Sequence, residues 1–159
     1  MKVRLGFVSN SSSSSFIGVG WDISDIDWNV FIDEYRKING DQYIIKALDH
    51  FLEPDQIKLL LNNESDENYV DIMSEEDIYL PDFIETLMAQ SNSSYVLENS
   101  EWFNYIVQHL PEEGNAKNFL SKCQQIIDNV ENDNNEFVNV IKKMTGREAE
   151  ICSECWQDC

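Results

Sequence analysis

Hydrophobic and polar residues follow two different periods along this chain, and each period predicts one kind of element. Residues 3–8 and 16–23 are short runs rich in β-branched and aromatic residues, which predict two β-strands. A run of serines separates them. Because both flanks of that run are apolar, we expect residues 1–23 to form a β-hairpin with the serines in its turn.

Most other apolar residues recur three and four positions apart, which is the spacing of a helix that buries one side. Trp28, Phe31 and Tyr35 mark a first helix, capped by Ser24 or Asp25 and ended by Gly40. Similar stripes predict five more helices and a last one that Gly146 ends; they cover residues 41–52, 54–61, 81–90, 100–110, 115–131 and 137–144.

Three stretches show no clear helical period. Residues 62–68 are polar and predict a loop, and residues 91–99 predict a loop with a short strand. Residues 69–73 predict a strand, after which Ser74 and Asp77 resemble a capping box with the shorter acid.

The order of these elements predicts an α+β fold. We expect one mostly helical domain over residues 1–159, with a small antiparallel sheet that includes the N-terminal hairpin. The Cys-rich tail, residues 147–159, is ambiguous between helix and other structure.

The charge of the chain is strongly negative and unevenly distributed. It carries 30 acidic and 11 basic residues, a formal net charge of −19. Residues 59–116 contain 13 of the acids and no lysine or arginine. Such a surface repels nucleic acid and anionic membranes and favours basic partners. A merely solvated acidic face explains the same composition, so this alternative stays open.

Eleven acids of this region form the predicted partner-binding surface. Acids three or four positions apart on a helix are neighbours about 5–6 Å apart. B-form DNA carries about one negative charge per 1.7 Å of its axis, so a row of carboxylates imitates it in order of magnitude. The residues of this predicted surface are Glu64, Asp66, Glu67, Asp71, Glu75, Glu76, Asp77, Asp82, Glu85, Glu98 and Glu101.

Three of the four cysteines are in the tail. Cys152, Cys155 and Cys159 are spaced as Cys-x2-Cys-x3-Cys, and thiolates at such short spacing can hold zinc or form a redox pair. In a helix the three thiols would instead lie on one face and pack as small apolar groups. No second ligand pair at fixed spacing is present, so we expect no metal. The candidates for a fourth ligand are Cys123, His50 and His109.

No strong catalytic motif is present. Phosphate-binding glycine loops and the Gly-x-Ser-x-Gly nucleophile motif are absent. The calcium-loop spacing that begins at Asp25 fails where Gly and Glu are required. We therefore expect no enzyme activity and no cofactor. The alternative is a small metal-binding or thiol-dependent enzyme that uses the tail cysteines.

The first 17 residues, MKVRLGFVSNSSSSSFI, resemble an N-terminus that recurs on otherwise dissimilar, uncharacterised proteins of bacteriophages and bacteria. The resemblance implies a phage or prophage gene, and it carries over no activity. The serine run is either a structural turn or a cluster of hydroxyls for a modifying enzyme. The shared residues are Gly6, Phe7, Val8, Ser9, Asn10, Ser11, Ser12, Ser13, Ser14, Ser15, Phe16 and Ile17.

No signal peptide is evident, and no window of 18 apolar residues predicts a membrane-spanning helix. We therefore expect reduced thiols and a location in the cytoplasm of the bacterial host. By association with small acidic phage proteins, we expect a role in host takeover or anti-defence. The predicted function is an inhibitor that binds a basic, nucleic-acid-binding surface of a host protein as a DNA or RNA mimic. We expect it to bind neither nucleic acid nor a membrane directly.

Overall fold

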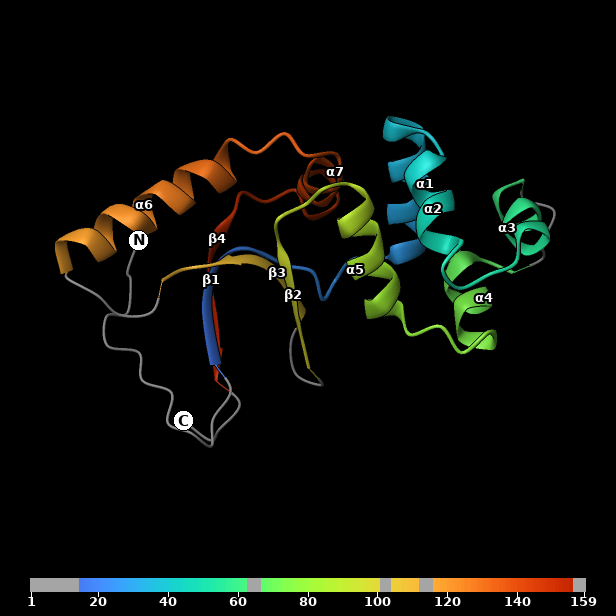
Figure 1. The fold of residues 1–159 in the computed structure, drawn as a ribbon, viewed down its shortest axis with the longest axis horizontal. Coiled ribbons are helices and arrows are strands. Elements are labelled where there is room, and N and C mark those ends of the chain that lie inside the picture. The colour runs from blue at the N-terminus through green and yellow to red at the C-terminus, as the bar shows by residue number, and fades with distance from the viewer. Residues whose placement is uncertain (1–14, 63–66, 101–103, 112–115, 156–159) are drawn as a thin grey trace. The chain divides into compact units, whose positions relative to one another are not determined.

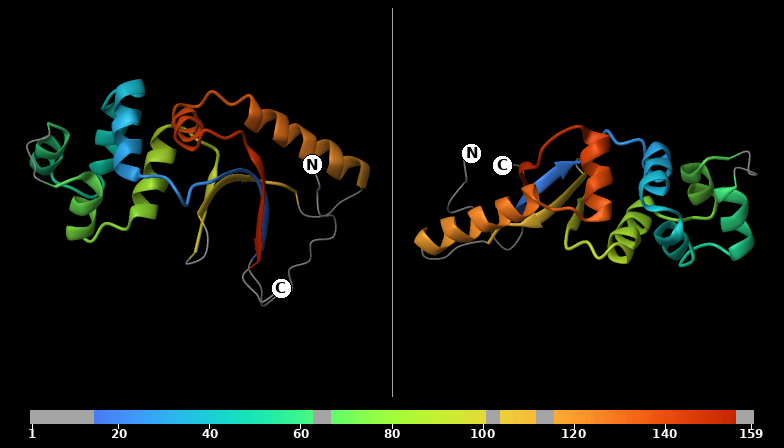
Figure 2. Two further views of the ribbon diagram at one scale, coloured as in Figure 1. Left: turned by 180° about the vertical axis from the view of Figure 1, so that it is seen from behind. Right: turned by 90° about the horizontal axis from the view of Figure 1, so that it is seen from above.

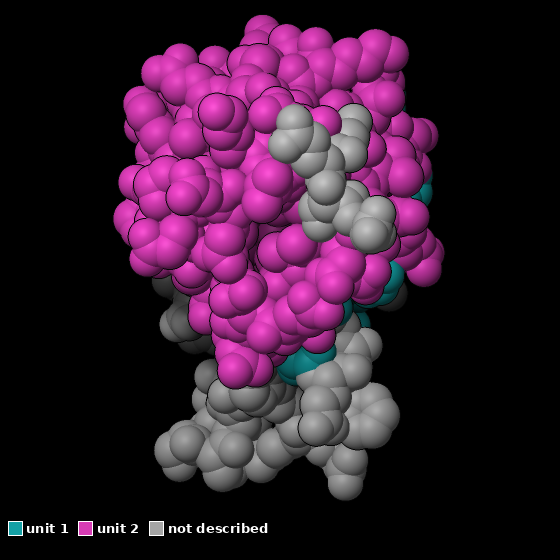
Figure 3. Space-filling model, turned by 90° about the vertical axis from the view of Figure 1, so that its right-hand side faces the viewer, with its two compact units in different colours: residues 1–24, 95–133, 147–159 teal, residues 25–94, 134–146 magenta. Residues whose placement is uncertain are grey.

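The computed structural model describes residues 15–62, 67–100, 104–111 and 116–155 (Figure 1). The chain divides into two compact units, each made of separate stretches of sequence. Unit 1 comprises residues 1–24, 95–133 and 147–159, and unit 2 comprises residues 25–94 and 134–146, drawn in teal and magenta in Figure 3. The chain passes between the units four times, so no single linker in the sequence marks the division.

Unit 1 is built on a four-stranded antiparallel sheet with the strand order β2-β3-β1-β4. Helix α6 (Ala116–Glu131) runs along one face of this sheet, as Figures 1 and 2 show. The strands are β1 (Ser15–Asp22), β2 (Val96–Asn99), β3 (Asn104–His109) and β4 (Glu150–Cys155).

Unit 2 is helical over its described residues. Phe31, Tyr35, Ile44, Phe83 and Phe137 are among its fully buried side chains and form the centre of its core. The buried Tyr35 hydroxyl is hydrogen-bonded to the Ser91 hydroxyl. The helices are α1 (Trp28–Asn39), α2 (Gln42–Leu48), α3 (Pro54–Leu61), α4 (Tyr69–Glu75), α5 (Leu80–Gln90) and α7 (Glu136–Thr145).

The α+β class and most of the expected helices are confirmed. Helices α3, α5, α6 and α7 occur where the apolar stripes predict them, and Gly146 ends α7 in the left-handed conformation with φ 63°. Helix α1 is also present, but its N-cap is Asp27 and not Ser24 or Asp25. The Asp27 carboxylate accepts hydrogen bonds from the backbone N–H groups of Asn29 and Val30.

The strand expected over residues 69–73 is wrong, because this segment is helix α4. The Asn68 side chain caps it by accepting a hydrogen bond from the backbone N–H of Asp71 at 2.8 Å. Tyr69 and Met73, four residues apart, are the buried side chains of this helix. The capping box expected at Ser74 is also wrong, since Ser74 lies within α4.

The helix expected over residues 100–110 is wrong as well. Residues 104–109 form strand β3, which pairs with β1 on one side and β2 on the other. The spacing of Ile106 and Leu110 is helical only by coincidence. Within β3, the two fully buried residues are the neighbours Ile106 and Val107, one on each face of a central strand.

The strand expected over residues 16–23 is confirmed as β1, which is a central strand of the sheet. Its partners among the described residues come from later in the chain: β3 pairs with residues 18–22 and β4 with residues 15–20. The first strand of the hairpin, expected over residues 3–8, lies outside the described residues, as do Ser11, Ser12, Ser13 and Ser14.

Strand β1 bends strongly, and the bend gives the sheet a concave face. Asp22 of β1 lies opposite Tyr105 of β3, whereas Phe16 lies six residues earlier in β1, which is about 20 Å along a flat strand. The rings of Phe16 and Tyr105 are nevertheless only 5.7 Å apart. The Tyr105 hydroxyl also donates to Glu154, the residue opposite Phe16 on β4. The two ends of the sheet therefore curl toward each other.

The concave face of the sheet encloses a small apolar cluster. Phe16, Val107 and Cys152 are buried in it, and Tyr105 packs against them. Glycine at position 20 makes this closeness possible, because a Cβ there would lie 1.9 Å from the carbonyl oxygen of Ile106. Val19 and Trp21 alternate with Gly18 and Gly20 along β1 and are buried on the opposite face.

Candidate functional site

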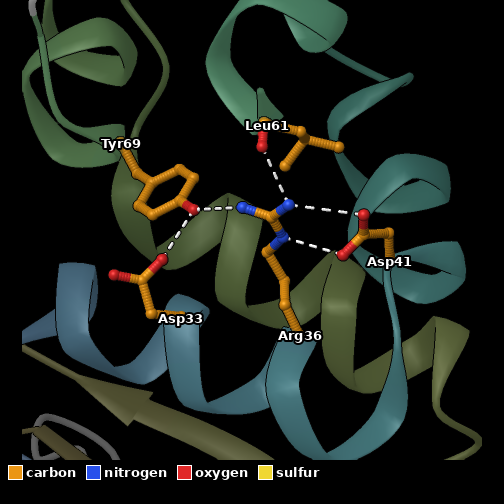
Figure 4. Close-up of polar contacts among 5 residues, drawn as sticks. All are labelled: Asp33, Arg36, Asp41, Leu61 and Tyr69. Atoms are coloured by element: carbon orange, nitrogen blue, oxygen red, sulfur yellow. Dashed lines mark hydrogen bonds and ion pairs between the residues drawn. The ribbon is translucent and has the colours of Figure 1, made fainter. Parts of the chain in front are cut away.

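Helix α4 carries Asp71 and Glu75 of the predicted surface, and a network of side chains holds this helix in place. Arg36 of α1 donates to the Asp41 carboxylate through Nε at 2.7 Å and Nη2 at 3.3 Å. Its Nη2 also donates to the carbonyl oxygen of Leu61 at 2.9 Å, and its Nη1 to the Tyr69 hydroxyl at 2.7 Å. Figure 4 shows Arg36 at the centre of these contacts. One guanidinium therefore connects α1 with the start of α2, the end of α3 and the start of α4.

The Tyr69 hydroxyl completes this network, which we call the Arg36 network. It accepts from Arg36 and donates to the Asp33 carboxylate at 2.7 Å (Figure 4). Beside it, the backbone N–H of Val70 donates to the Asn29 side chain at 3.0 Å. The partners of Arg36 raise its pKa further above its usual range, the hydrogen bond with Asp41 contributing most. These bonds fix the rotation of α4, so that Tyr69 and Met73 point inward and the acids point outward.

Helix α5 presents the next acids in the same way. Pro81 lies in its first turn, where a missing N–H has no cost. Phe83, Ile84, Leu87 and Met88 are buried on its inner side, which leaves Asp82 and Glu85 on the exposed side. The Asp82 carboxylate in the first turn also faces the positive end of the helix dipole, which stabilises the helix.

No lysine or arginine lies among the exposed acids of α4, α5 and the turn between these helices. We call residues 71–85 the acidic segment. Its six carboxylates are all exposed, and none forms an ion pair with another described residue. Glu76 accepts one hydrogen bond, from the neutral Gln56 amide at 3.1 Å. The six residues are Asp71, Glu75, Glu76, Asp77, Asp82 and Glu85.

The other five acids of the predicted surface lie outside the acidic segment. Glu67 precedes α4 and is only partly exposed, and Glu98 is on β2 in unit 1. Glu98 is not an exposed, unpaired acid, because its Oε1 lies 2.6 Å from Nε2 of His109. The structure therefore separates Glu98 from the acidic segment. Glu64, Asp66 and Glu101 lie outside the described residues.

The division into units also divides the charge. Unit 2 contains 18 acidic and 6 basic residues, a formal net charge of −12, whereas unit 1 contains 12 and 5, a net charge of −7. Unit 2 therefore holds most of the excess negative charge. Its bases lie outside the acidic segment, and two of them, Arg36 and Lys143, are paired with Asp41 and Glu34.

Unit 1 contains a hollow of about 740 Å³ beside the end of β3. Its apolar lining comes from Phe16 and Ile17 of β1, Leu110 and Pro111 after β3, and Ile126 of α6. The backbone N–H of Leu110 donates to the carbonyl oxygen of Ile17 at 2.9 Å, which continues the β1–β3 pairing to the edge of the hollow.

Three polar side chains also line the hollow: His109 of β3 and Lys122 and Gln125 of α6. The imidazole of His109 stacks on the Phe16 ring with centroids 6.1 Å apart. Sequence reasoning missed this group as a site, because its members come from segments far apart in the chain. The sequence singles out only Phe16 and Ile17, as motif residues, and His109, as a metal candidate.

Cys152 packs as an apolar residue in the concave face of the sheet. Burial raises the pKa of its thiol to about 12, so the thiol stays protonated near neutral pH. A neutral, buried thiol is a poor nucleophile and a poor metal ligand. Of the alternatives left open for the tail, the helix is wrong, because Glu150–Cys155 form strand β4. Cys159 lies outside the described residues, as does the side chain of Cys155.

The other metal candidates are spread over both units. Cys123 is buried on the inner side of α6, and His50 lies in the exposed turn after α2. Within the described ranges, no three His, Cys, Asp or Glu side chains are close enough to share a metal ion. The described helices also include none with the length and apolar character needed to cross a membrane.

Comparisons with models of known protein families, with curated proteins and with solved structures found no match to this chain.

Proposed function

We propose that this chain is a phage-encoded, non-enzymatic inhibitor that uses its acidic segment to bind a nucleic-acid-binding surface of a host protein. One observation carries the proposal. Six carboxylates are exposed along 15 residues of unit 2, with no base among them and no ion pair to a described base. In such a row the negative charge is available to a partner and not already neutralised within the fold.

The rigidity of the segment supports the same function. Helix α4 is held by the Arg36 network and helix α5 by four buried apolar side chains. A partner therefore meets four of the six carboxylates on helices whose backbones are already ordered, so little backbone entropy is lost on binding. Arrays of carboxylates on such helices imitate the phosphates of a nucleic acid, so the natural counterpart is a groove lined with lysine and arginine.

The role in host takeover or anti-defence depends on the N-terminal resemblance, which implies a phage gene. The proposed location, the cytoplasm of the bacterial host, follows from the same inference. The proposal contains no catalytic residue, no cofactor and no direct contact with nucleic acid or membrane. It rests on electrostatic complementarity alone, and it therefore predicts a strong dependence of binding on salt.

Retention of host proteins on the immobilised chain tests this function. The segment variant replaces all six acids of the acidic segment by their amides. The control variant replaces six other exposed acids by amides, so that both variants have the same net charge. The control positions are Asp25, Asp49, Asp55, Glu131, Glu148 and Glu150.

From a nuclease-treated bacterial lysate at low salt, the wild type and the control variant should retain the same nucleic-acid-binding protein. The segment variant should not retain it, and high salt should release it from the wild type and the control variant. Equal retention by the segment variant and the control variant would refute a role for the acidic segment. Retention of no nucleic-acid-binding protein would refute the proposed function itself.

A further inference from the structure

The hollow of unit 1 has the construction of a small-molecule site. Its volume of about 740 Å³ lies within the usual range of ligand pockets, roughly 300–1,000 Å³. Five of the lining side chains are apolar and three are polar. Binding sites commonly combine apolar walls with a few polar groups that orient the ligand.

Two side chains that line the hollow, Phe16 and His109, are held in place by contacts within unit 1. Phe16 is buried, stacks on His109 and contacts the edge of Tyr105. The His109 imidazole is held on its other side by Glu98 at 2.6 Å. Because these side chains have little freedom to lose, a ligand would bind them without a large entropic cost.

Helix α6 contributes the polar wall. Lys122, Gln125 and Ile126 lie on one side of α6, at positions i, i+3 and i+4. The Lys122 ammonium and the Gln125 amide have no hydrogen bond or ion pair with any other described residue. Two side-chain donors that line the hollow are therefore available to a ligand.

The charge of unit 1 makes Lys122 distinctive. The unit has a net charge of −7, and Lys122 is its only lysine with a described side chain. A positive group beside an apolar wall, on a unit that otherwise repels anions, selects a ligand that has both an apolar body and one negative end.

We propose that the hollow binds a small organic anion, with its apolar body against Phe16, Ile17 and Ile126 and its acidic end on Lys122. Carboxylates and sulfonates share the required chemistry, since each accepts a charge-assisted hydrogen bond from an ammonium group. Phe16 and Ile17 are the last residues of the N-terminal motif, so the proposal also gives that aromatic and aliphatic pair a role.

Two fluorescent probes of the same ring skeleton test the proposal. One is 8-anilinonaphthalene-1-sulfonate, an apolar anion, and the other is the neutral N-phenyl-1-naphthylamine. Each is titrated into the full chain, into Lys122→Met and into Lys58→Met. Lys58 is an exposed lysine of α3 in unit 2, so its replacement makes the same change in net charge away from the hollow.

The sulfonate should bind the wild type at one saturable site. Lys122→Met should weaken its affinity roughly tenfold, the loss expected for one charge-assisted hydrogen bond. The same variant should change the affinity of the neutral probe less than about twofold, and Lys58→Met should change neither by more than that. Backbone amide signals of Leu110 and Gln125 should shift during the titration.

Three results would overturn the proposal: no saturable binding of the sulfonate, equal weakening by both lysine variants, or saturation that leaves the amides around the hollow unmoved. The proposal is independent of the acidic segment. The segment variant should bind the sulfonate as the wild type does, so the failure of either proposal can be recognised without the other.

Discussion

Gly20 lies where strand β1 passes closest to β3. A methyl group there would meet the carbonyl oxygen of Ile106 at 1.9 Å, whereas at Gly18 it would meet the Val107 side chain at 2.7 Å. The overlap at Gly20 is closer by 0.8 Å and is with the paired backbone of β3 itself. We therefore expect Gly20→Ala to lower the free energy of unfolding by about 2–3 kcal/mol or more, and Gly18→Ala by less. Urea denaturation measures both, and a larger loss for Gly18→Ala would contradict the described path of β1.

Arg36 makes four hydrogen bonds from one guanidinium, and its neighbour Lys37 is exposed. Arg36→Met leaves the Leu61 carbonyl, the Tyr69 hydroxyl and the Asp41 carboxylate without the hydrogen bonds that Arg36 donates. It should therefore cost about 2–3 kcal/mol of unfolding free energy. Lys37→Met removes the same charge without these bonds and should cost less than about 0.5 kcal/mol. Equal losses in the two variants, measured by urea denaturation, would show that the Arg36 network does not hold α4.

The thiol of Cys152 links stability to pH. The folded state holds its proton up to about pH 12, whereas an unfolded thiol releases it near pH 9. Above about pH 9 the unfolded chain therefore binds fewer protons than the folded chain, so the free energy of unfolding falls as the pH rises toward 12. Denaturation curves of Cys152→Val at several pH values should show a smaller fall over this window. A fall identical to that of the wild type would contradict the burial of this thiol.

At the scale of elements, helix α4 shows how one N-cap determines whether a short segment forms a helix or a strand. The five residues 69–73 are rich in apolar side chains and are too few to distinguish a period of two from a period of 3.6. The Asn68 cap settles the choice in favour of a helix. The same ambiguity explains the error over residues 104–109, where pairing with β1 and β2 determines the strand. The longer, capped stripes of α6 and α7 were predicted correctly because they repeat over several turns.

The cap of α4 can be tested directly. Asn68→Ala removes the acceptor of the Asp71 backbone N–H and should lower the free energy of unfolding by about 1 kcal/mol. Amide hydrogen exchange should accelerate first in residues 69–75. Asn129→Ala, at an exposed position within α6, is the matched control and should be neutral or slightly stabilising. Unchanged exchange in α4 after loss of the cap would contradict this account.

At the scale of the whole molecule, the sequence predicts the composition of the surface better than its arrangement. The base-free stretch of residues 59–116 is visible in the sequence, and its central acids lie exposed on α4 and α5. The sequence does not show that Glu98 belongs to unit 1 and pairs with His109 there. That pairing depends on the neighbouring strands β2 and β3. The hollow could not be predicted either, since residues 16–17, 109–111 and 122–126 meet only after folding.

The most direct test of the central claim is a competition between this chain and nucleic acid for the retained host protein. Labelled DNA or RNA bound to that host protein is followed by fluorescence anisotropy while the chain is added at low salt. The wild type and the control variant should displace the nucleic acid at similar concentrations, and the segment variant should need at least about tenfold more. Formation of a ternary complex, or equal displacement by the segment variant, would contradict binding through the acidic segment to a nucleic-acid-binding surface.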